Sequence, residues 1–323
     1  MNTAKSKIRW VIILLLILNT QNYSQHELFT VLAVGGKVFL KKANMLEWKN
    51  INTGQKLFSG DSIKINSDGY IGFAHRSLST LELNKSGSYF ADSLAEQLDT
   101  SQKSVSKKLV AFIIDEMADK KKGSNEMRTL GAVVRLSKNK IDVNLPTDVC
   151  LFDTTFQFSW YPNAKTEKYV FQLLNPAFKT IYMKEISDTS LSLDLQTLNL
   201  QSTETYNWLV FDPQNKEVLS DTIKFNVLSK ARKESIMNDV YLLSLEKNDE
   251  KNILDHLMLA SFYKNNKLYL EALNEYKNIL SIMPNVDEFW ESYLQFLMDI
   301  GLKREALNEW QRSTFANRSL IND

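Results

Sequence analysis

The sequence predicts a multidomain α+β protein, with a β roll first, a β-sandwich in the centre and an all-α region at the C-terminus. Seven of the ten glycines fall between Gly35 and Gly87, so tight turns crowd into the first part of the chain. Six runs of alternating apolar residues follow within 144–228, which indicates strands with one buried face. A five-residue motif then recurs at an offset of 34 positions, which indicates paired helices.

The first 25 residues predict a secretory signal peptide. Lys5, Lys7 and Arg9 precede an apolar run of nine residues, 10–18, and a polar stretch follows it. This order of charge and apolarity is typical of an exported leader, whereas a membrane-spanning helix takes about 20 apolar residues. We therefore expect an exported, periplasmic protein. The alternative is that the segment stays uncleaved and anchors the chain in the membrane.

Short strands and frequent turns predict a compact β roll over residues 26–89. We expect a strand with a glycine kink at 34–40, a turn and a strand within 57–65, a turn at 67–69, and strands at 70–74 and 79–83.

This part of the chain resembles the FecR-like domain. The resemblance rests on the glycine-valine strand, on Trp48, on Leu57-x-x-Gly60-Asp61-x-Ile63 and on the Leu-x-Leu strand at 81–83. It implies a periplasmic location, and the best-known members relay a signal from an outer-membrane receptor to a sigma factor. No cytoplasmic segment precedes the apolar run here, so we expect a periplasmic binding role. A sensory component linked to an envelope receptor is the alternative function.

Residues 90–143 are expected to connect the first two domains. Ser93 and Glu96 have the spacing of a capping box, which predicts that a short helix begins there. Apolar residues at three- and four-residue spacing predict an amphipathic helix over 104–119, and a short strand is expected at 132–135.

The central domain, 144–228, resembles a fibronectin type III or immunoglobulin-like sandwich. Its alternating runs are Phe156-Phe158-Trp160, Tyr169-Phe171-Leu173, Ile181-Met183, Leu191-Leu193-Leu195, Tyr206-Trp208-Val210 and Ile223-Phe225-Val227. We expect Trp160 and Trp208 to pack across the two sheets, with a carbohydrate-binding platform as the alternative role of these aromatics. Cys150 has no partner for a disulfide and is expected to be a buried small hydrophobe.

The last domain, 229–323, resembles tetratricopeptide repeats. Residues 271–275 and 305–309 both read Glu-Ala-Leu-Asn-Glu, at the 34-residue period of that helix-turn-helix unit. Two units are expected, at 253–286 and 287–320, with a helix over 231–245 standing in as a third. His256 replaces the usual tryptophan of the first unit and is expected to be a packed or surface imidazole.

In such arrays one helix face lines a concave groove, and motif position gives its candidate partner-binding residues. These are Leu254, Leu257, Ser261, Lys264, Asn265, Glu288, Glu291, Gln295, Met298 and Asp299. Three acids against one lysine favour a basic or polar peptide segment. The alternative is a solvated face that holds no ligand.

The composition points away from catalysis and from nucleic acid. The 39 basic and 38 acidic residues nearly cancel, and three His with one Cys leave little for a zinc site. Phosphate-binding, dinucleotide, HExxH and GxSxG motifs are absent from the sequence, and Ser104-x-x-Lys107 lacks the companion motifs of penicillin-recognising enzymes.

We therefore expect a non-enzymatic binding or scaffold protein of the cell envelope, without cofactor or metal. Its expected partners are an envelope protein or peptide segment and, through the β domains, peptidoglycan. Peripheral membrane association is compatible with this function. A glycan hydrolase with paired carboxylates is the remaining enzymatic alternative, because their spacing is spatial.

Overall fold

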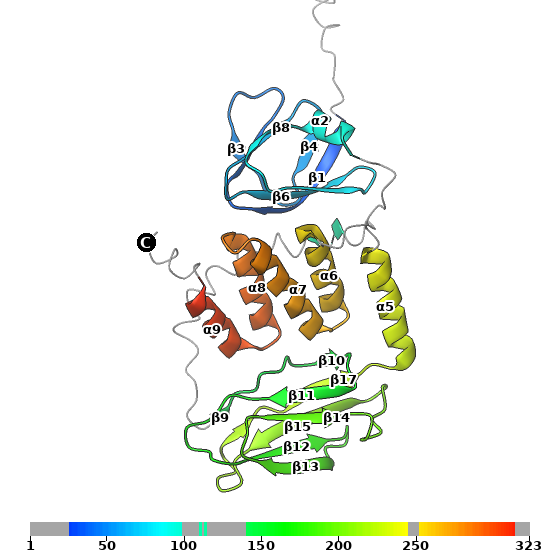
Figure 1. Ribbon diagram of the computed structural model, residues 1–323, viewed down its shortest axis with the longest axis vertical. Helices are drawn as coiled ribbons and strands as arrows, with labels where there is room; N and C mark the ends of the chain where they lie inside the picture. Colours follow the sequence, from blue (N-terminus) through cyan, green and yellow to red (C-terminus); the bar gives the residue numbers. More distant parts are fainter. Residues whose placement is uncertain (1–25, 99–109, 112, 115–139, 245–251, 314–323) are drawn as a thin grey trace, which may run out of the picture.

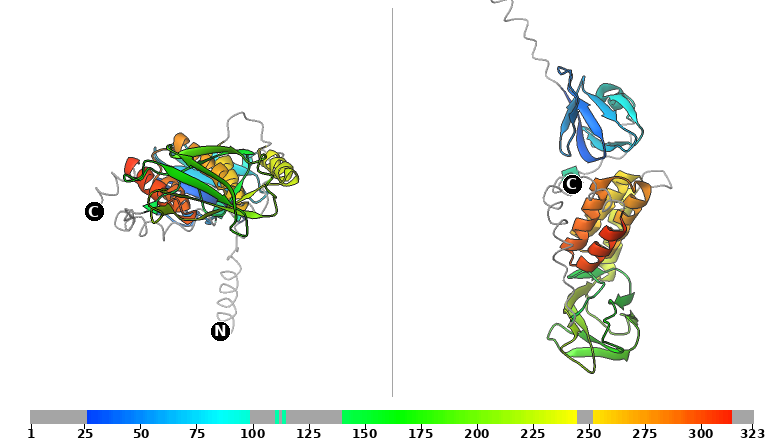
Figure 2. Two further views of the ribbon diagram at one scale, coloured as in Figure 1. Left: turned by 90° about the horizontal axis from the view of Figure 1, so that it is seen from below. Right: turned by 90° about the vertical axis from the view of Figure 1, so that its left-hand side faces the viewer.

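The computed structural model describes residues 26–98, 110–111, 113–114, 140–244 and 252–313. The molecule is elongated, and its helices lie between two β parts (Figure 1). The second view in Figure 2 shows the same stacking from the side. The spatial order therefore differs from the chain order, in which the helices come last. The predicted α+β class is confirmed, with β-sheets in the first two thirds of the chain and helices after them.

The β roll consists of two four-stranded antiparallel sheets, β4-β1-β6-β7 and β3-β2-β5-β8. Its strands are β1 (Glu27–Gly35), β2 (Val38–Lys41), β3 (Lys49–Asn50), β4 (Lys56–Phe58), β5 (Ser62–Ile65), β6 (Tyr70–His75), β7 (Thr80–Leu83) and β8 (Gly87–Phe90). The single strand expected at 34–40 is wrong, because β1 and β2 belong to different sheets. The chain turns between them at Gly36, which has a φ of 65° and where a Cβ would lie 2.0 Å from the carbonyl oxygen of Asp68.

A short helix, α2 (Ala91–Glu96), closes the roll. The predicted capping box is wrong, because the helix begins two residues before Ser93 and its N-cap, Phe90, makes no side-chain cap. The start is instead fixed by Asp92, which accepts hydrogen bonds from Ser59 and Gly60. Ala91 and Leu94 are buried in the roll core, so the roll extends beyond the expected boundary at residue 89.

The central part is two packed sheets, one mixed and seven-stranded and the other the β11-β14 pair. The strands are β9 (Lys140–Ile141), β10 (Val149–Leu151), β11 (Thr155–Ser159), β12 (Tyr169–Leu174), β13 (Thr180–Ile186), β14 (Ser190–Asp194), β15 (Thr205–Phe211), β16 (Leu219–Ser220) and β17 (Ile223–Val227). All six alternating runs form strands. The expected buried face of β13 is wrong, because Ile181 and Met183 are exposed while Tyr182 packs against the core.

Trp160 and Trp208 are both buried, as expected, and Phe171 stacks between them, with ring centroids 6.5 and 5.5 Å away. Burial in the core does not fit the alternative of an exposed carbohydrate platform. Cys150 is only half buried, which differs from the expectation. It follows Val149 in the edge strand β10, at the side of the sheet that faces the helices.

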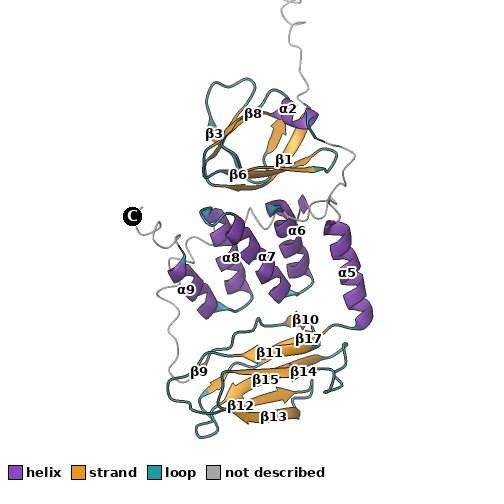
Figure 3. Ribbon diagram, viewed as in Figure 1, coloured by secondary structure: helices purple, strands orange, loops and turns teal. Residues whose placement is uncertain are grey.

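Five helices of the C-terminal part lie between the two β parts (Figure 3). They are α5 (Lys230–Ser244), α6 (Ile253–Asn265), α7 (Tyr269–Ile282), α8 (Asp287–Asp299) and α9 (Lys303–Arg312). The starts of α8 and α9 lie 34 residues after those of α6 and α7, and Ala272 and Ala306 are fully buried at the fourth position of α7 and α9. Two equivalent helical hairpins therefore follow each other in the chain.

The remaining expected elements either differ from the structure or fall outside the described residues. Among the described side chains of α5, only Ile236 is fully buried, so this helix adds little to the core. Residues 110–111 and 113–114 are helical, and Ile113 is buried against the helices. The rest of the helix expected at 104–119, the strand expected at 132–135 and the leader lie outside the described residues.

Candidate functional site

The β roll covers the N-terminal ends of α6 and α8. A Cβ on Gly72 of β6 would lie 2.5 Å from Leu254 Cδ2, and one on Gly35 of β1 would lie 2.2 Å from Val286 Cγ1. The ring of Tyr70 meets that of Phe289 edge-on, with centroids 5.5 Å apart. These contacts make one apolar core out of residues from both parts.

Two glutamates add polar contacts at this junction. Glu82 Oε2 accepts hydrogen bonds from Tyr70 Oη at 2.9 Å and from the backbone N–H of Leu254 at 3.3 Å. Burial raises the pKa of the Glu82 carboxyl above its ordinary value, and these two hydrogen bonds oppose the shift. Glu288 Oε2 accepts from the N–H of Gly36 at 3.0 Å. The roll is thus joined to the N-terminal ends of α6 and α8, the first helix of each hairpin.

The sandwich covers the opposite ends of the hairpins. The N–H groups of Thr147 and Cys150 donate to the carbonyls of Ile300 and Lys267, at 3.1 and 2.9 Å, and Lys267 pairs with Asp148. Tyr269 and Leu270, at the start of α7, pack against both the helical core and the sandwich core.

A polar cluster strengthens this second junction at α9. Tyr161 Oη donates to Glu305 Oε2 at 2.6 Å, and Arg304 reaches Asp142 at 3.1 Å while its guanidinium lies 4.2 Å from the centroid of the Tyr161 ring. Burial, followed by the carboxylate of Glu305, raises the pKa of the Tyr161 phenol. The helices are therefore fixed at both ends.

The N-terminal half of the predicted groove is not open. Leu254, Leu257 and Ser261 are buried, and the Ser261 hydroxyl has no hydrogen-bond partner among the described residues. The prediction that Leu257 and Ser261 line an accessible groove is therefore wrong, because both side chains are buried within the chain's own packing. Glu288 is half buried and held by Gly36.

The C-terminal half of the same face does reach the surface. Asn265 and Asp299 are exposed, and Lys264 and Gln295 are partly exposed. The Lys264 ammonium lies 5.5 Å from the centroid of the Phe296 ring, which brings the end of α6 against α8. Gln295 donates to Asp299 at 2.8 Å. Glu291 and Met298 are partly buried on the same helix. The accessible candidate face is thus smaller and more polar than the sequence suggested.

A buried polar pair links the first hairpin internally. His256 Nδ1 lies 2.6 Å from Glu275 Oε2, and both residues are about 8% exposed. The imidazole therefore bridges α6 and α7 inside the core. Among the described residues, no group of three or more His, Cys, Asp and Glu side chains could hold a metal ion. The sequence argument did not identify Glu275, whose partner lies on the other helix.

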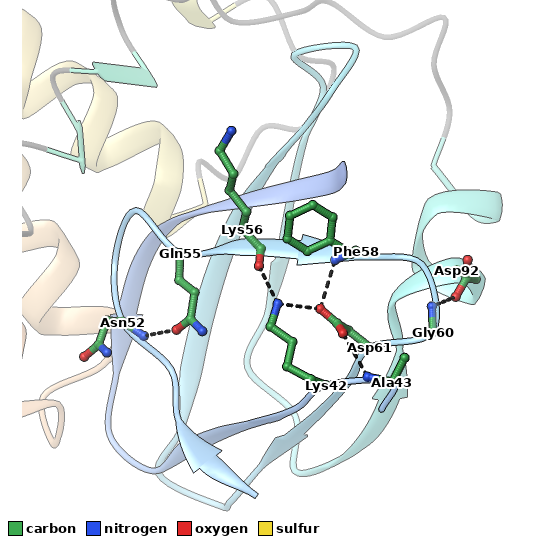
Figure 4. A network of polar contacts seen from close by, with 9 residues as sticks. All are labelled: Lys42, Ala43, Asn52, Gln55, Lys56, Phe58, Gly60, Asp61 and Asp92. Carbon is green, nitrogen blue, oxygen red and sulfur yellow. Dashed lines mark hydrogen bonds and ion pairs between the residues drawn. The ribbon is translucent and has the colours of Figure 1, made fainter. Parts of the chain in front are cut away.

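The Gly60-Asp61 motif of the roll forms a saturated structural network (Figure 4). The fully buried Asp61 carboxylate accepts from Lys42 Nζ at 2.8 Å, from the N–H of Phe58 at 2.9 Å and from the N–H of Ala43 at 3.2 Å. Lys42 also donates to the carbonyl of Lys56. These hydrogen bonds fix the turn before β5, so the Gly60-Asp61 motif has a structural role in the roll.

A pocket of about 550 Å³ lies where the sandwich joins α5, and the sequence analysis did not identify it. Leucine and valine side chains, carboxamides and two lysines line it: Thr154, Leu195, Gln196, Asn199, Leu200, Gln201, Val227, Leu228, Lys230 and Lys233. No loop motif marks it, because its walls come from three separate segments.

No helix within the described ranges combines the length and apolarity that crossing a membrane would require.

Comparison with known proteins leaves the family open. No protein-family model matches the chain, and no curated protein matches it. Among solved structures, the FN1–FN3 domains of chicken CNTN1 are similar over 61% of this chain and 54% of that one, at 12% identity and a TM-score of 0.20. A β-1,2-glucanase from Parabacteroides distasonis is similar over 80% of this chain and 49% of its own, at 8% identity and a TM-score of 0.21. The chain spans about half the length of each, and scores this low carry no argument about function.

Proposed function

We propose that the protein is a non-catalytic binding and scaffold protein of the bacterial cell envelope, exported to the periplasm, that holds an extended polypeptide on its helical hairpins. One observation carries this proposal. Both ends of the hairpins are covered by β parts, while the end of α6 and the facing part of α8 keep polar side chains at the surface. A lateral face is therefore the place left for a partner.

The helical hairpins support a tetratricopeptide-like assignment. Their starts repeat at 34 residues, and the small side chains of Ala272 and Ala306 let each helix pair approach closely. On the candidate face Lys264 carries one positive charge, against the negative charges of Glu291 and Asp299. This balance favours a basic or polar segment, and its recognition would be weakened by salt.

The β parts would act as the fixed ends of the scaffold. The roll, which we assign as FecR-like from its Gly60-Asp61 turn, and the sandwich, which we assign as fibronectin type III-like from its six alternating strands, would contact a second partner or the wall polymer. Their apolar junctions with the helices keep the three parts in one arrangement.

Site-specific photo-crosslinking in the cell tests the proposal. A photoreactive amino acid at Asn265 or Gln295 is expected to give polypeptide adducts. The same residue at Lys277 or Asn278, which are exposed on α7, is the matched control. Equal yields from the two sets, or no adducts from either, would contradict a binding face on α6 and α8.

A sensory component is the second candidate function. The partly buried carboxyl of Glu82 lies between the roll and α6, so a signal that displaces the roll would change the contacts of α6. This function needs a membrane link to a receptor. Sequencing of the N-terminus separates the two, because the scaffold function expects a cleaved chain and the sensory function expects the apolar leader to be retained.

A further inference from the structure

An exposed apolar cluster lies at the end of the β roll that faces away from the helices. Its members are Met45, Leu46 and Trp48 in the loop between β2 and β3, and Phe90 at the end of β8; we call them the apolar tip. Their exposed fractions are 49%, 96%, 37% and 63%. Leu46 is thus almost completely exposed to solvent. Groups of exposed large apolar residues on a folded protein commonly mark an interaction site.

The strand register brings the four side chains to one end of one sheet. Lys41 pairs with Ser62, and Ser62 pairs with Phe90, so these three residues form one row across β2, β5 and β8. The loop that carries the rest of the tip leaves β2 at Lys41. Figure 1 shows β8 and α2 at the top of the roll and β3 at its left side, with the helices below the roll.

Basic residues outnumber acidic ones in the segment 41–49 that carries most of the apolar tip. The Lys41 ammonium lies 5.3 Å from the centroid of the Trp48 ring, and the exposed Lys49 is the next residue after Trp48 in the chain. Lys42 is neutralised by Asp61, and Glu47 contributes the one acid within the loop 42–48. Tryptophan and leucine flanked by lysine is the composition that partitions into the headgroup region of a bilayer.

The start of the described chain lies at the same end. The carbonyl of His26 accepts a hydrogen bond from the N–H of Ser59, in the turn that leads into β5. Seven residues separate His26 from the apolar run 10–18, and they span at most about 25 Å. Before any cleavage of the predicted leader, its apolar run is thus tethered to the end of the roll that exposes the tip.

We propose that the apolar tip binds the surface of an anionic phospholipid bilayer. Met45 and Leu46 enter the headgroup region, Trp48 lies at the interface, and Lys41 and Lys49 meet lipid phosphates. The roll then contacts the membrane, and the helices and the sandwich project away from the membrane surface. This surface is separate from the lateral face proposed for a polypeptide partner.

Vesicle co-sedimentation of the protein, as isolated from the exporting cell, tests this inference. Binding is expected to phosphatidylglycerol-containing vesicles, more weakly to pure phosphatidylcholine, and to decrease with salt. Leu46→Glu is expected to lower the partition coefficient about tenfold or more, because an apolar contact is replaced by a charge. Met183→Glu is the matched control, since Met183 is 61% exposed on the sandwich at the far end of the molecule.

Hydrogen exchange of residues 42–49 gives a local measurement that a retained leader would not change. Anionic vesicles are expected to protect these amides in the wild-type protein and not in Leu46→Glu. Wild-type partitioning by Leu46→Glu, or no protection with vesicles, would overturn the proposal. Protection that appears with protein concentration alone would also overturn it, by identifying a second copy of the chain as the occupant.

Discussion

The close approach of β6 to α6 predicts a strong energetic coupling between Gly72 and Leu254. A methyl group on Gly72 would lie 2.5 Å from Leu254 Cδ2 and 2.9 Å from Leu254 Cγ, which are distances that packed atoms do not adopt. Overpacking of this kind costs about 1–3 kcal/mol. We therefore expect Gly72→Ala to destabilise β6 and α6 together, although alanine is otherwise the better residue in a strand.

The double variant Gly72→Ala/Leu254→Ala tests whether the cost of Gly72→Ala comes from contact with Leu254. Leu254 is 1% exposed, and Leu254→Ala is expected to cost about 2–5 kcal/mol. Once that side chain is truncated, the methyl of Gly72→Ala enters free space and contributes its ordinary gain of roughly 0.5–1 kcal/mol. The two substitutions are therefore expected to couple by about 1.5 kcal/mol or more.

Native-state hydrogen exchange in increasing urea measures the free energies of opening for β6 and α6 in one experiment. The control cycle pairs Leu254→Ala with Ser88→Ala, an exposed residue of β8 that is expected to be additive within about 0.5 kcal/mol. Additive effects of Gly72→Ala and Leu254→Ala would refute the argument, as would destabilisation of β6 without α6.

Three further outcomes are expected. Burial raises the pKa of Glu271, whose Oε2 has no hydrogen-bond partner among the described residues. The folded state therefore binds the proton of this carboxyl more tightly than the unfolded state does. The contribution of Glu271 to stability consequently falls as the pH rises above the ordinary pKa of 4.5. Glu271→Gln should therefore gain in unfolding free energy over wild type as the pH rises above about 4.5, and not below it. A gain that is independent of pH would contradict this. Glu275→Ala should cost about 1–3 kcal/mol in urea unfolding by leaving His256 unpaired in the core, while Lys277→Ala, at an exposed site, should change little. Burial raises the pKa of the Cys150 thiol, so its alkylation should be slow in the folded protein. Alkylation should be faster in the double variant Arg304→Ala/Glu305→Ala, which removes contacts between α9 and the sandwich. A wild-type rate equal to that of the unfolded chain would count against docking of the sandwich on the helices.

The elements that the sequence predicts best are those whose signal is local. Period-2 alternation marks β11, β12, β14, β15 and β17 because each buries one face in the sandwich. The 34-residue offset marks the two hairpins, since each repeats the same helix contacts. Neither signal depends on where the parts lie relative to one another.

Features that depend on contacts between parts were not predictable in this way. In β6, Ile71 and Phe73 face the roll core while Tyr70 and Ala74 face the helices, so both sides are buried, and the apolar run at 70–74 does not identify the helices as the cover of the second side. Burial within the folded chain likewise removes Leu257 and Ser261 from the expected groove. For β13 the prediction fails in the opposite direction: the apolar residues Ile181 and Met183, expected to be buried, are exposed. β13 is an edge strand, where such exposure costs little.

The two junctions also constrain how the helical part can work. The first-turn glutamates of the repeated motif, Glu271 and Glu305, both lie towards the sandwich: Glu305 accepts a hydrogen bond from Tyr161, and the carboxylate of Asp153 is near enough to Glu271 to raise its pKa further. At the other end Leu254 and Val286 fill spaces left by glycines of the roll. An excised helical fragment would expose these apolar ends, so its stability depends on both β parts. A polypeptide bound across α6 and α8 would consequently act on one connected body, and force on the partner would pass to the roll and the sandwich through these same contacts.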